Sequence, residues 1–160
     1  MTTATSESRV QSTHFVRVFL GGLLGGLLSN VSGIALGAFV LQADASKVLH
    51  AIENPPSTTR MFLEHVLMRF GIGLAAAWLY WAILPRFEGR TRAIVAAVTF
   101  LWLTTYLFPV LILEELRIYS TRTAVIGAAW GFVELVFVVT TVAWVLRDAA
   151  DQRPGGWLAP

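Results

Sequence analysis

The chain has 160 residues, of which 56% are hydrophobic and only 14% are charged, and its formal net charge is +2. Soluble domains carry about 45–50% apolar and about 25% charged residues, so the composition argues against a soluble enzyme. The scattered basic residues form no block of the kind that binds nucleic acid, and without cysteine the chain can form no disulfide, cysteine nucleophile or cysteine-held metal site.

Residues 1–14 are polar and lack apolar periodicity, which predicts a flexible N-terminal tail. Four apolar stretches follow, each long enough to form a helix that crosses a bilayer. The predicted helices cover residues 15–41, 60–84, 91–113 and 121–146, and a flexible C-terminal tail is predicted over 148–160. The short link between the second and third helices makes them an antiparallel pair. The sequence therefore predicts an all-α, integral membrane four-helix bundle with antiparallel up-down topology.

Two local features qualify the predicted helices. Pro109 lies inside the third one, where it leaves the Thr105 carbonyl without its helical hydrogen bond and predicts a kink. Ala43-Asp44-Ala45 has the small-x-small form of a signal-peptide cleavage site. The apolar run before it is longer than the roughly 7–15 residues of a signal core, so we expect the first helix to be retained.

Basic residues beside the predicted helix ends favour one orientation, because Lys and Arg are enriched on the cytoplasmic side. With both termini inside, seven basic residues lie on the inner side and four on the outer side. The inner ones are Arg9, Arg17, Arg86, Arg90, Arg92, Arg147 and Arg153, and the outer ones are Lys47, Arg60, Arg117 and Arg122. We therefore expect a multi-pass protein of the cell inner (plasma) membrane with both termini in the cytoplasm.

Small residues occupy every fourth position along the first predicted helix, at Gly21, Gly25, Ser29, Gly33 and Gly37. A second row, Gly22 and Gly26, leads to Asn30, and the fourth predicted helix carries Gly127 and Gly131. In lipid, rows of small residues let helix backbones approach closely. The rows predict packing within the bundle, and a homodimer or larger membrane complex through the first row is the alternative.

Three residues inside the predicted spans stand out because a bilayer penalises them, and they are Asn30, Arg69 and Glu134. A charge at the bilayer centre costs about 2.5–3.5 kcal/mol on insertion scales, so these groups should face the interior and have partners. We expect Glu134 to pair with Arg69 while Asn30 donates to the carboxylate, which would hold the helices in register. The alternatives are a proton or ion path, a polar substrate site, or an Arg69 that extends outward beside a protonated Glu134.

Glu64 and His65 lie nearer the outer surface, and we expect them to form a pair at the membrane interface. A haem or chlorophyll ligand is the alternative for His65, and a lipid-modifying enzyme could use only Glu64, His65 and Arg69. The sequence contains no metal quartet, phosphate loop or catalytic triad. We therefore expect no metal, no cofactor and no enzymatic activity.

The second half of the chain carries several short motifs built on aromatic, proline and glycine residues. They are Trp78-Leu79-Tyr80, Leu84-Pro85-Arg86-Phe87, Trp102, Pro109, Ala129-Trp130-Gly131-Phe132-Val133-Glu134 and Ala143-Trp144-Val145-Leu146-Arg147. In these positions the chain resembles an uncharacterised family of small four-transmembrane-helix bacterial membrane proteins. Glu88 interrupts the Gly/Pro pattern that follows the Pro-Arg-Phe turn in that family. The resemblance implies the topology and draws attention to Glu134, but it implies no activity.

These observations together favour a non-enzymatic accessory or structural membrane subunit. We expect it to lie in the lipid bilayer and to bind no nucleic acid. The alternative is a small oligomeric transporter or proton- or ion-conducting protein that uses Asn30, Arg69 and Glu134.

Overall fold

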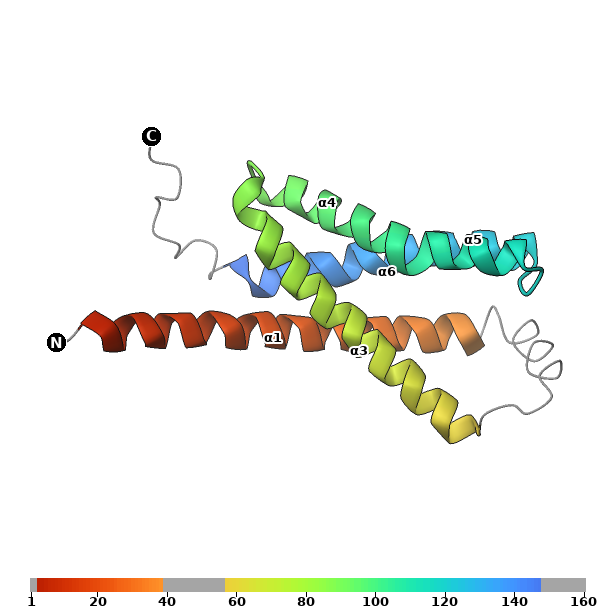
Figure 1. Cartoon of the computed structure of the whole chain (residues 1–160), viewed down its shortest axis with the longest axis horizontal. Coiled ribbons are helices and arrows are strands. Elements are labelled where there is room, and N and C mark those ends of the chain that lie inside the picture. The colour runs from red at the N-terminus through yellow and green to blue at the C-terminus, as the bar shows by residue number, and fades with distance from the viewer. Residues whose placement is uncertain (1–2, 39–56, 148–160) are drawn as a thin grey trace.

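A computed structural model of the chain describes residues 3–38 and 57–147. The α-helices within these ranges are α1 (Thr3–Leu36), α3 (Thr58–Ile83), α4 (Arg90–Trp102), α5 (Phe108–Glu115) and α6 (Thr121–Val145) (Figure 1). A 3-10 turn over Leu84–Arg86 follows α3, and a π-helical turn over Leu103–Leu107 joins α4 to α5. No strand occurs in the described ranges, so the predicted all-α fold is confirmed.

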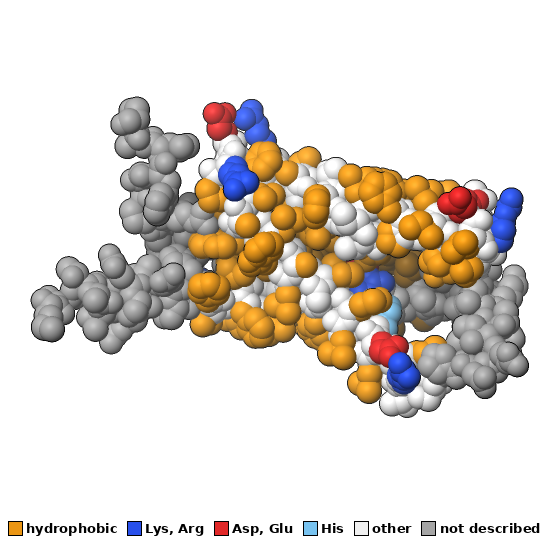
Figure 2. All heavy atoms as spheres, viewed as in Figure 1, with side chains coloured by type: hydrophobic (Ala, Val, Ile, Leu, Met, Phe, Trp, Pro, Cys, Tyr) orange, Lys and Arg blue, Asp and Glu red, His pale blue; other side chains and the backbone are white. Residues whose placement is uncertain are grey.

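Within the described ranges, four helical units are long and apolar enough to cross a membrane, and they cover Phe15–Leu36, Thr58–Arg86, Arg90–Glu115 and Thr121–Val145. Figure 1 shows that α1 and the α4–α5 unit run in one direction while α3 and α6 return, with α3 crossing α1 at a steep angle. On the face that Figure 2 shows, hydrophobic side chains cover most of the described residues, whereas charged side chains gather mainly toward the two ends. This distribution is the one that a bilayer requires of a multi-pass protein.

The start of α1 differs from the expectation of a flexible tail over residues 1–14, because the helix begins at Thr3. Helix formation is cooperative, so once the apolar span is helical each added residue gains a hydrogen bond without a new nucleus. Ala4, Glu7, Arg9 and Gln11 suit such an extension because their intrinsic helix propensities are high. The predicted tail over 148–160 lies outside the described residues.

The third span contains a wide, π-helical turn directly before Pro109. The Phe108 N–H donates to the Leu103 carbonyl, five residues back. The Thr104 hydroxyl donates to the Phe100 carbonyl at 2.9 Å. The Thr105 hydroxyl likewise donates to the Leu101 carbonyl at 2.6 Å. These hydroxyls supply donors inside the span, where lipid offers none.

The two small-residue rows of α1 face two different helices. Gly22 and Gly26 pack on α3, since a Cβ atom on Gly26 would lie 2.8 Å from the Phe70 Cα atom. Gly21 and Gly25 pack on α6, since a Cβ atom on Gly25 would lie 3.1 Å from a Val138 methyl carbon. Rows one residue apart point in directions about 100° apart on a helix, so a single helix can contact two neighbours through small residues.

The tightest contact of the fold lies where α1 and α3 cross, at Gly22, Gly26 and Gly73. A Cβ atom on Gly73 would lie 2.6 Å from the Gly26 Cα atom, which leaves no room for any side chain. The hydrophobic core lies beside this glycine crossing and includes Ala76, Tyr80, Ala97, Leu135, Val139 and Leu146. The backbone contact at the crossing therefore fixes where α1 and α3 meet, and the core fixes how α4 and α6 cover them.

Candidate functional site

Glu134 lies at the middle of α6, and its side chain is only 1% exposed. Its Oε1 atom accepts hydrogen bonds from Ser29 Oγ at 2.7 Å, Arg69 Nη1 at 2.5 Å and Tyr106 Oη at 2.5 Å. Ser29 belongs to α1, Arg69 to α3 and Tyr106 to the π turn between α4 and α5. One carboxylate oxygen therefore receives a donor from each of the other three spans. We call these four residues the polar centre.

Arg69 supplies the positive charge of the polar centre. Its Nη1 atom donates to Glu134 and also to Tyr106 Oη at 2.6 Å, while Ser29 Oγ lies at 3.3 Å. The two closest contacts account for both hydrogens that Nη1 carries. The guanidinium group lies against Gly33, where a Cβ atom would come within 2.7 Å of Arg69 Cζ. Gly33 therefore makes the space that lets a long charged side chain reach across α1.

Tyr106 reaches the polar centre because the π turn shifts the inward face of the third span. The inward positions of α4 are buried at Ala93, Ala97 and Leu101, four residues apart, and the next buried position is Tyr106, five residues later. A regular α-helix would turn Tyr106 about 140° away from Leu101. Gly131 of α6 then provides the room, since a Cβ atom there would lie 2.7 Å from a carbon of the Tyr106 ring.

Asn30 is not part of the polar centre, which corrects the expectation that it donates to Glu134. Its Nδ2 atom donates to the Gly26 carbonyl at 2.9 Å and lies 3.3 Å from the Val66 carbonyl of α3. Its Oδ1 atom is buried and has no hydrogen-bond partner among the described residues. Asn30 follows the row of α1 that faces α3, so the neighbouring Ser29 is the residue that faces α6 and bonds the carboxylate.

Glu64 and His65 do not form the predicted interfacial pair. Glu64 accepts from Arg60 one turn earlier, with Arg60 Nε at 2.8 Å from Glu64 Oε1 in an exposed position. Successive residues on a helix do not face each other, whereas residues four apart do, which explains the exchange of partner. His65 is half-buried on the face that leads to Arg69. The described residues contain no group of three His, Cys, Asp or Glu side chains that could hold a metal ion.

The remaining small residues predicted to pack helices behave differently from one another. Gly127 of α6 approaches the α5 residue Val110, with 3.8 Å from its would-be Cβ atom to a Val110 methyl carbon. Gly37 has nothing within 4 Å of such an atom in the described part of the chain. The repeat at every fourth position thus contains residues of three kinds: Gly21 and Gly25 pack on α6, Ser29 and Gly33 build the polar centre, and Gly37 remains open.

Sequence reasoning missed Tyr106 and assigned Ser29 only to packing. The available signal for Tyr106 was a phenol in the middle of an apolar span, three residues before a proline. For Ser29 the signal was a hydroxyl in a row otherwise made of glycines. Both point to a hydrogen bond within the bundle, because a hydroxyl buried without a partner is costly.

In the comparisons with known proteins, no family model, no curated protein and no solved structure matches this chain. The resemblance to a four-helix bacterial family, noted for the second half of the sequence, stays a prediction. The polar centre is therefore interpreted from its own geometry.

Proposed function

We propose that this chain is a non-enzymatic integral membrane subunit whose polar centre holds four spans in one fixed arrangement, so that the bundle can serve as an accessory or structural part of a membrane assembly. The observation that carries the proposal is the convergence of three donors, one from each of the other spans, on Glu134 Oε1. Any movement of one span against the others would break at least one of these bonds.

The charge balance of the polar centre supports a fixed role. Arg69 and Glu134 neutralise each other, and their side chains are 12% and 1% exposed. A buried pair of this kind is costly to separate, because either charge alone would stay in a low-dielectric environment without compensation. The four residues include a phenol and an alcohol, and both donate to the same carboxylate oxygen. They include no activated nucleophile, so the centre suits a role that holds helices together better than a reaction site.

The proposal includes a place and an orientation, the cell inner membrane with both termini in the cytoplasm. Arg86, Arg90 and Arg92 follow α3 at the end of the bundle where α6 finishes, and the bias of basic residues toward that side supports the orientation. A cysteine placed in either terminus should resist a membrane-impermeant maleimide in intact cells. Labelling of either terminus would overturn the orientation.

The functional proposal is tested by measuring flux and assembly on the same protein. Purified chain in proteoliposomes should conduct protons no faster than protein-free vesicles under an imposed potential. Tagged at its chromosomal locus and extracted in mild detergent, it should migrate with a membrane complex larger than its own mass. A chain that migrates alone and conducts protons through a Glu134-dependent path would contradict the proposal.

A second candidate, a small oligomeric transporter or proton-conducting protein, is favoured by two observations. Tyr106 of the polar centre lies in a π turn, and such turns are frequent at functional sites. Glu134 Oε2 and Asn30 Oδ1 are buried acceptors without a partner among the described residues. This candidate predicts flux that Glu134→Gln abolishes and Asn30→Leu reduces, with both variants folded.

A further inference from the structure

An open groove lies along α1, near the end of the bundle where α6 finishes. Its volume is about 760 Å³, and its walls include Leu20, Leu23, Leu24 and Leu27 of α1 together with Trp144 and Arg147. We call it the leucine groove. Leu20 and Leu27 are 50% and 53% exposed, so the groove opens on the apolar surface of the bundle. In a chain that spans a bilayer, this surface faces lipid tails.

The leucine groove has the depth of one leaflet. The apolar span of α1 begins at Phe15, and Leu27 lies about 18 Å further along the helix axis. The hydrocarbon core is about 30 Å thick, so one leaflet contributes about 15 Å. A Cβ atom on Gly21 would lie 3.6 Å from a Val145 methyl carbon, which places the start of this span beside the end of α6. Arg147 therefore lies at the interfacial end of the groove.

Basic residues gather at that interfacial end. Arg147 lines the groove, and its guanidinium carbon lies 5.6 Å from the centroid of the Trp144 ring. Arg90, the first residue of α4, donates from Nη2 to the Arg147 carbonyl at 3.1 Å. Arg17 comes three residues before Leu20 in α1, a spacing that places both on one side of the helix. Three arginines from different parts of the chain thus lie near the end of an apolar groove.

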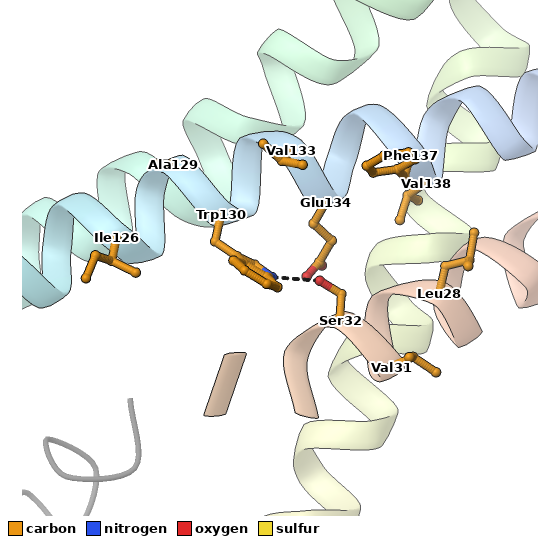
Figure 3. A pocket seen from close by; sticks show the side chains of 10 residues that line it. All are labelled: Leu28, Val31, Ser32, Ile126, Ala129, Trp130, Val133, Glu134, Phe137 and Val138. Atoms are coloured by element: carbon orange, nitrogen blue, oxygen red, sulfur yellow. Dashed lines mark hydrogen bonds between the residues drawn. The ribbon is translucent and has the colours of Figure 1, made fainter. Parts of the chain in front are cut away.

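A second pocket, at mid-span between α1 and α6, lacks such a basic end (Figure 3). Its volume is about 670 Å³, and we call it the mid-span pocket. Val133 and Phe137 in its wall are 53% and 65% exposed, so it also opens toward lipid. Trp130 and Ser32 bond each other across it, and Glu134 is engaged in the polar centre. No Lys or Arg is among the described residues that line it, so it offers nothing that distinguishes one headgroup from another.

We propose that the leucine groove binds one anionic phospholipid, with an acyl chain along the leucines and the phosphate at Arg147 and Arg17. Of the described residues that line the groove, Arg147 is the one that carries a charge, and this charge is complementary to the headgroup. Arginine binds phosphate oxygens through two parallel N–H groups, which favours it at such a site. The site goes beyond the proposed accessory function and does not depend on it.

The test uses phosphatidylglycerol with a mid-chain diazirine, added to the full chain in phosphatidylcholine vesicles. The matched probe is phosphatidylcholine that carries the same photoreactive chain. We expect phosphatidylglycerol to label Leu24 and Leu27 at least about fivefold more strongly, because each basic residue near an anionic headgroup contributes about fivefold in affinity. Water-soluble glycerol phosphate in excess should not compete, since it has no chain to fill the groove.

Two glutamine substitutions separate the headgroup contact from general surface charge. Arg147→Gln should lower labelling by phosphatidylglycerol about fivefold and leave labelling by phosphatidylcholine unchanged. Arg122→Gln removes the same charge from an exposed position at the opposite end of α6, and should change neither. Equal labelling of the groove by the two lipids, a preference for phosphatidylglycerol that survives Arg147→Gln, or competition by glycerol phosphate would each overturn the proposal.

Two tryptophan substitutions test where the acyl chain lies. Leu24→Trp fills the leucine groove and should abolish labelling there, whereas Val133→Trp fills the mid-span pocket and should leave it unchanged. Both residues point toward lipid and neither belongs to the polar centre, so both variants should keep the helix content of the wild type by circular dichroism. Labelling of the groove that survives Leu24→Trp, or that is lost in Val133→Trp, would contradict the assigned site. If Leu24→Trp does not fold, the Arg147→Gln comparison decides alone.

Discussion

Helices α1 and α3 contact each other in two neighbouring regions, and different interactions stabilise each region. At the glycine crossing, Gly22, Gly26 and Gly73 bring the backbones together, and the contact is dispersion between main chains. About one turn further along α1, at the polar centre, the helices are linked by Arg69 and Ser29 through Glu134. The first region depends on shape and tolerates no side chain. The second depends on chemistry and should tolerate changes that keep its donors.

Among the substitutions that add one methyl group or remove one hydroxyl, the glycine crossing gives the largest expected effect. Gly73→Ala should destabilise the bundle by about 3 kcal/mol or more, because the new methyl group would meet the backbone of Gly26 and not a side chain that can move away. The measurement is reversible unfolding in mixed detergent micelles.

Gly71→Ala on the same helix is the matched control, because nothing lies within 4 Å of a Cβ atom there. The control variant should be neutral or slightly stabilising, since alanine favours a helix over glycine by about 1 kcal/mol. Equal effects of the two substitutions would show that α1 and α3 do not touch at Gly73. The backbone contact assigned to the glycine crossing would then be wrong.

The polar centre should respond next most strongly to loss of one donor. Tyr106→Phe removes the hydroxyl that donates to Glu134 and accepts from Arg69, and should cost about 1.5–3 kcal/mol, as hydrogen bonds to charged groups do. Tyr80→Phe is the control, because Tyr80 is 1% exposed and no hydrogen bond of its hydroxyl occurs in the described part of the chain. If Tyr106→Phe and Tyr80→Phe lower the free energy of unfolding by the same amount, the Tyr106 side chain contributes by packing alone.

The smallest of the three effects should come from Gly33, where shape and chemistry meet. Gly33→Ala places a methyl group on the Arg69 guanidinium, a flexible group that can shift, so we expect a loss of about 1–2 kcal/mol. Gly37→Ala, four residues later in the same row, meets nothing within 4 Å in the described structure and should be silent. A measured loss at Gly37 that matches the loss at Gly33 would mean that Gly37 also packs against a neighbour, and it would contradict the open position assigned to it.

The spans themselves could be predicted from the sequence because lipid demands apolar residues along their entire length. The fourth predicted helix, over 121–146, differs from α6 by one residue. The irregular parts could not be predicted in the same way. The π turn at Leu103–Leu107 depends on how Tyr106 fits against Gly131, which is a tertiary contact, and the sequence shows only Pro109. The extension of α1 to Thr3 arises from cooperativity with the span and has no apolar pattern of its own.

The polar centre could be predicted in part for a related reason. Arg69 and Glu134 stand out because a bilayer penalises charges, and the structure brings them together. Ser29 and Asn30 are adjacent in sequence, and only the rotation of α1 decides which of them faces α6. Tyr106 required knowledge of the wide turn. The cost of placing a single charged residue in lipid can be read from a sequence. The rotation of one helix relative to another is set by the packing of the whole bundle.

The central claim, that the Arg69–Glu134 pair at the polar centre links the spans, is tested most directly by a double-mutant cycle. Glu134→Gln and Arg69→Met should each destabilise the bundle, because breaking a buried pair costs about 3–5 kcal/mol in soluble proteins. The double variant should recover much of that loss, with a coupling of at least about 1 kcal/mol between the two positions. Losses that simply add, with no coupling, would contradict the account, since they would mean that the two charges are buried without depending on each other.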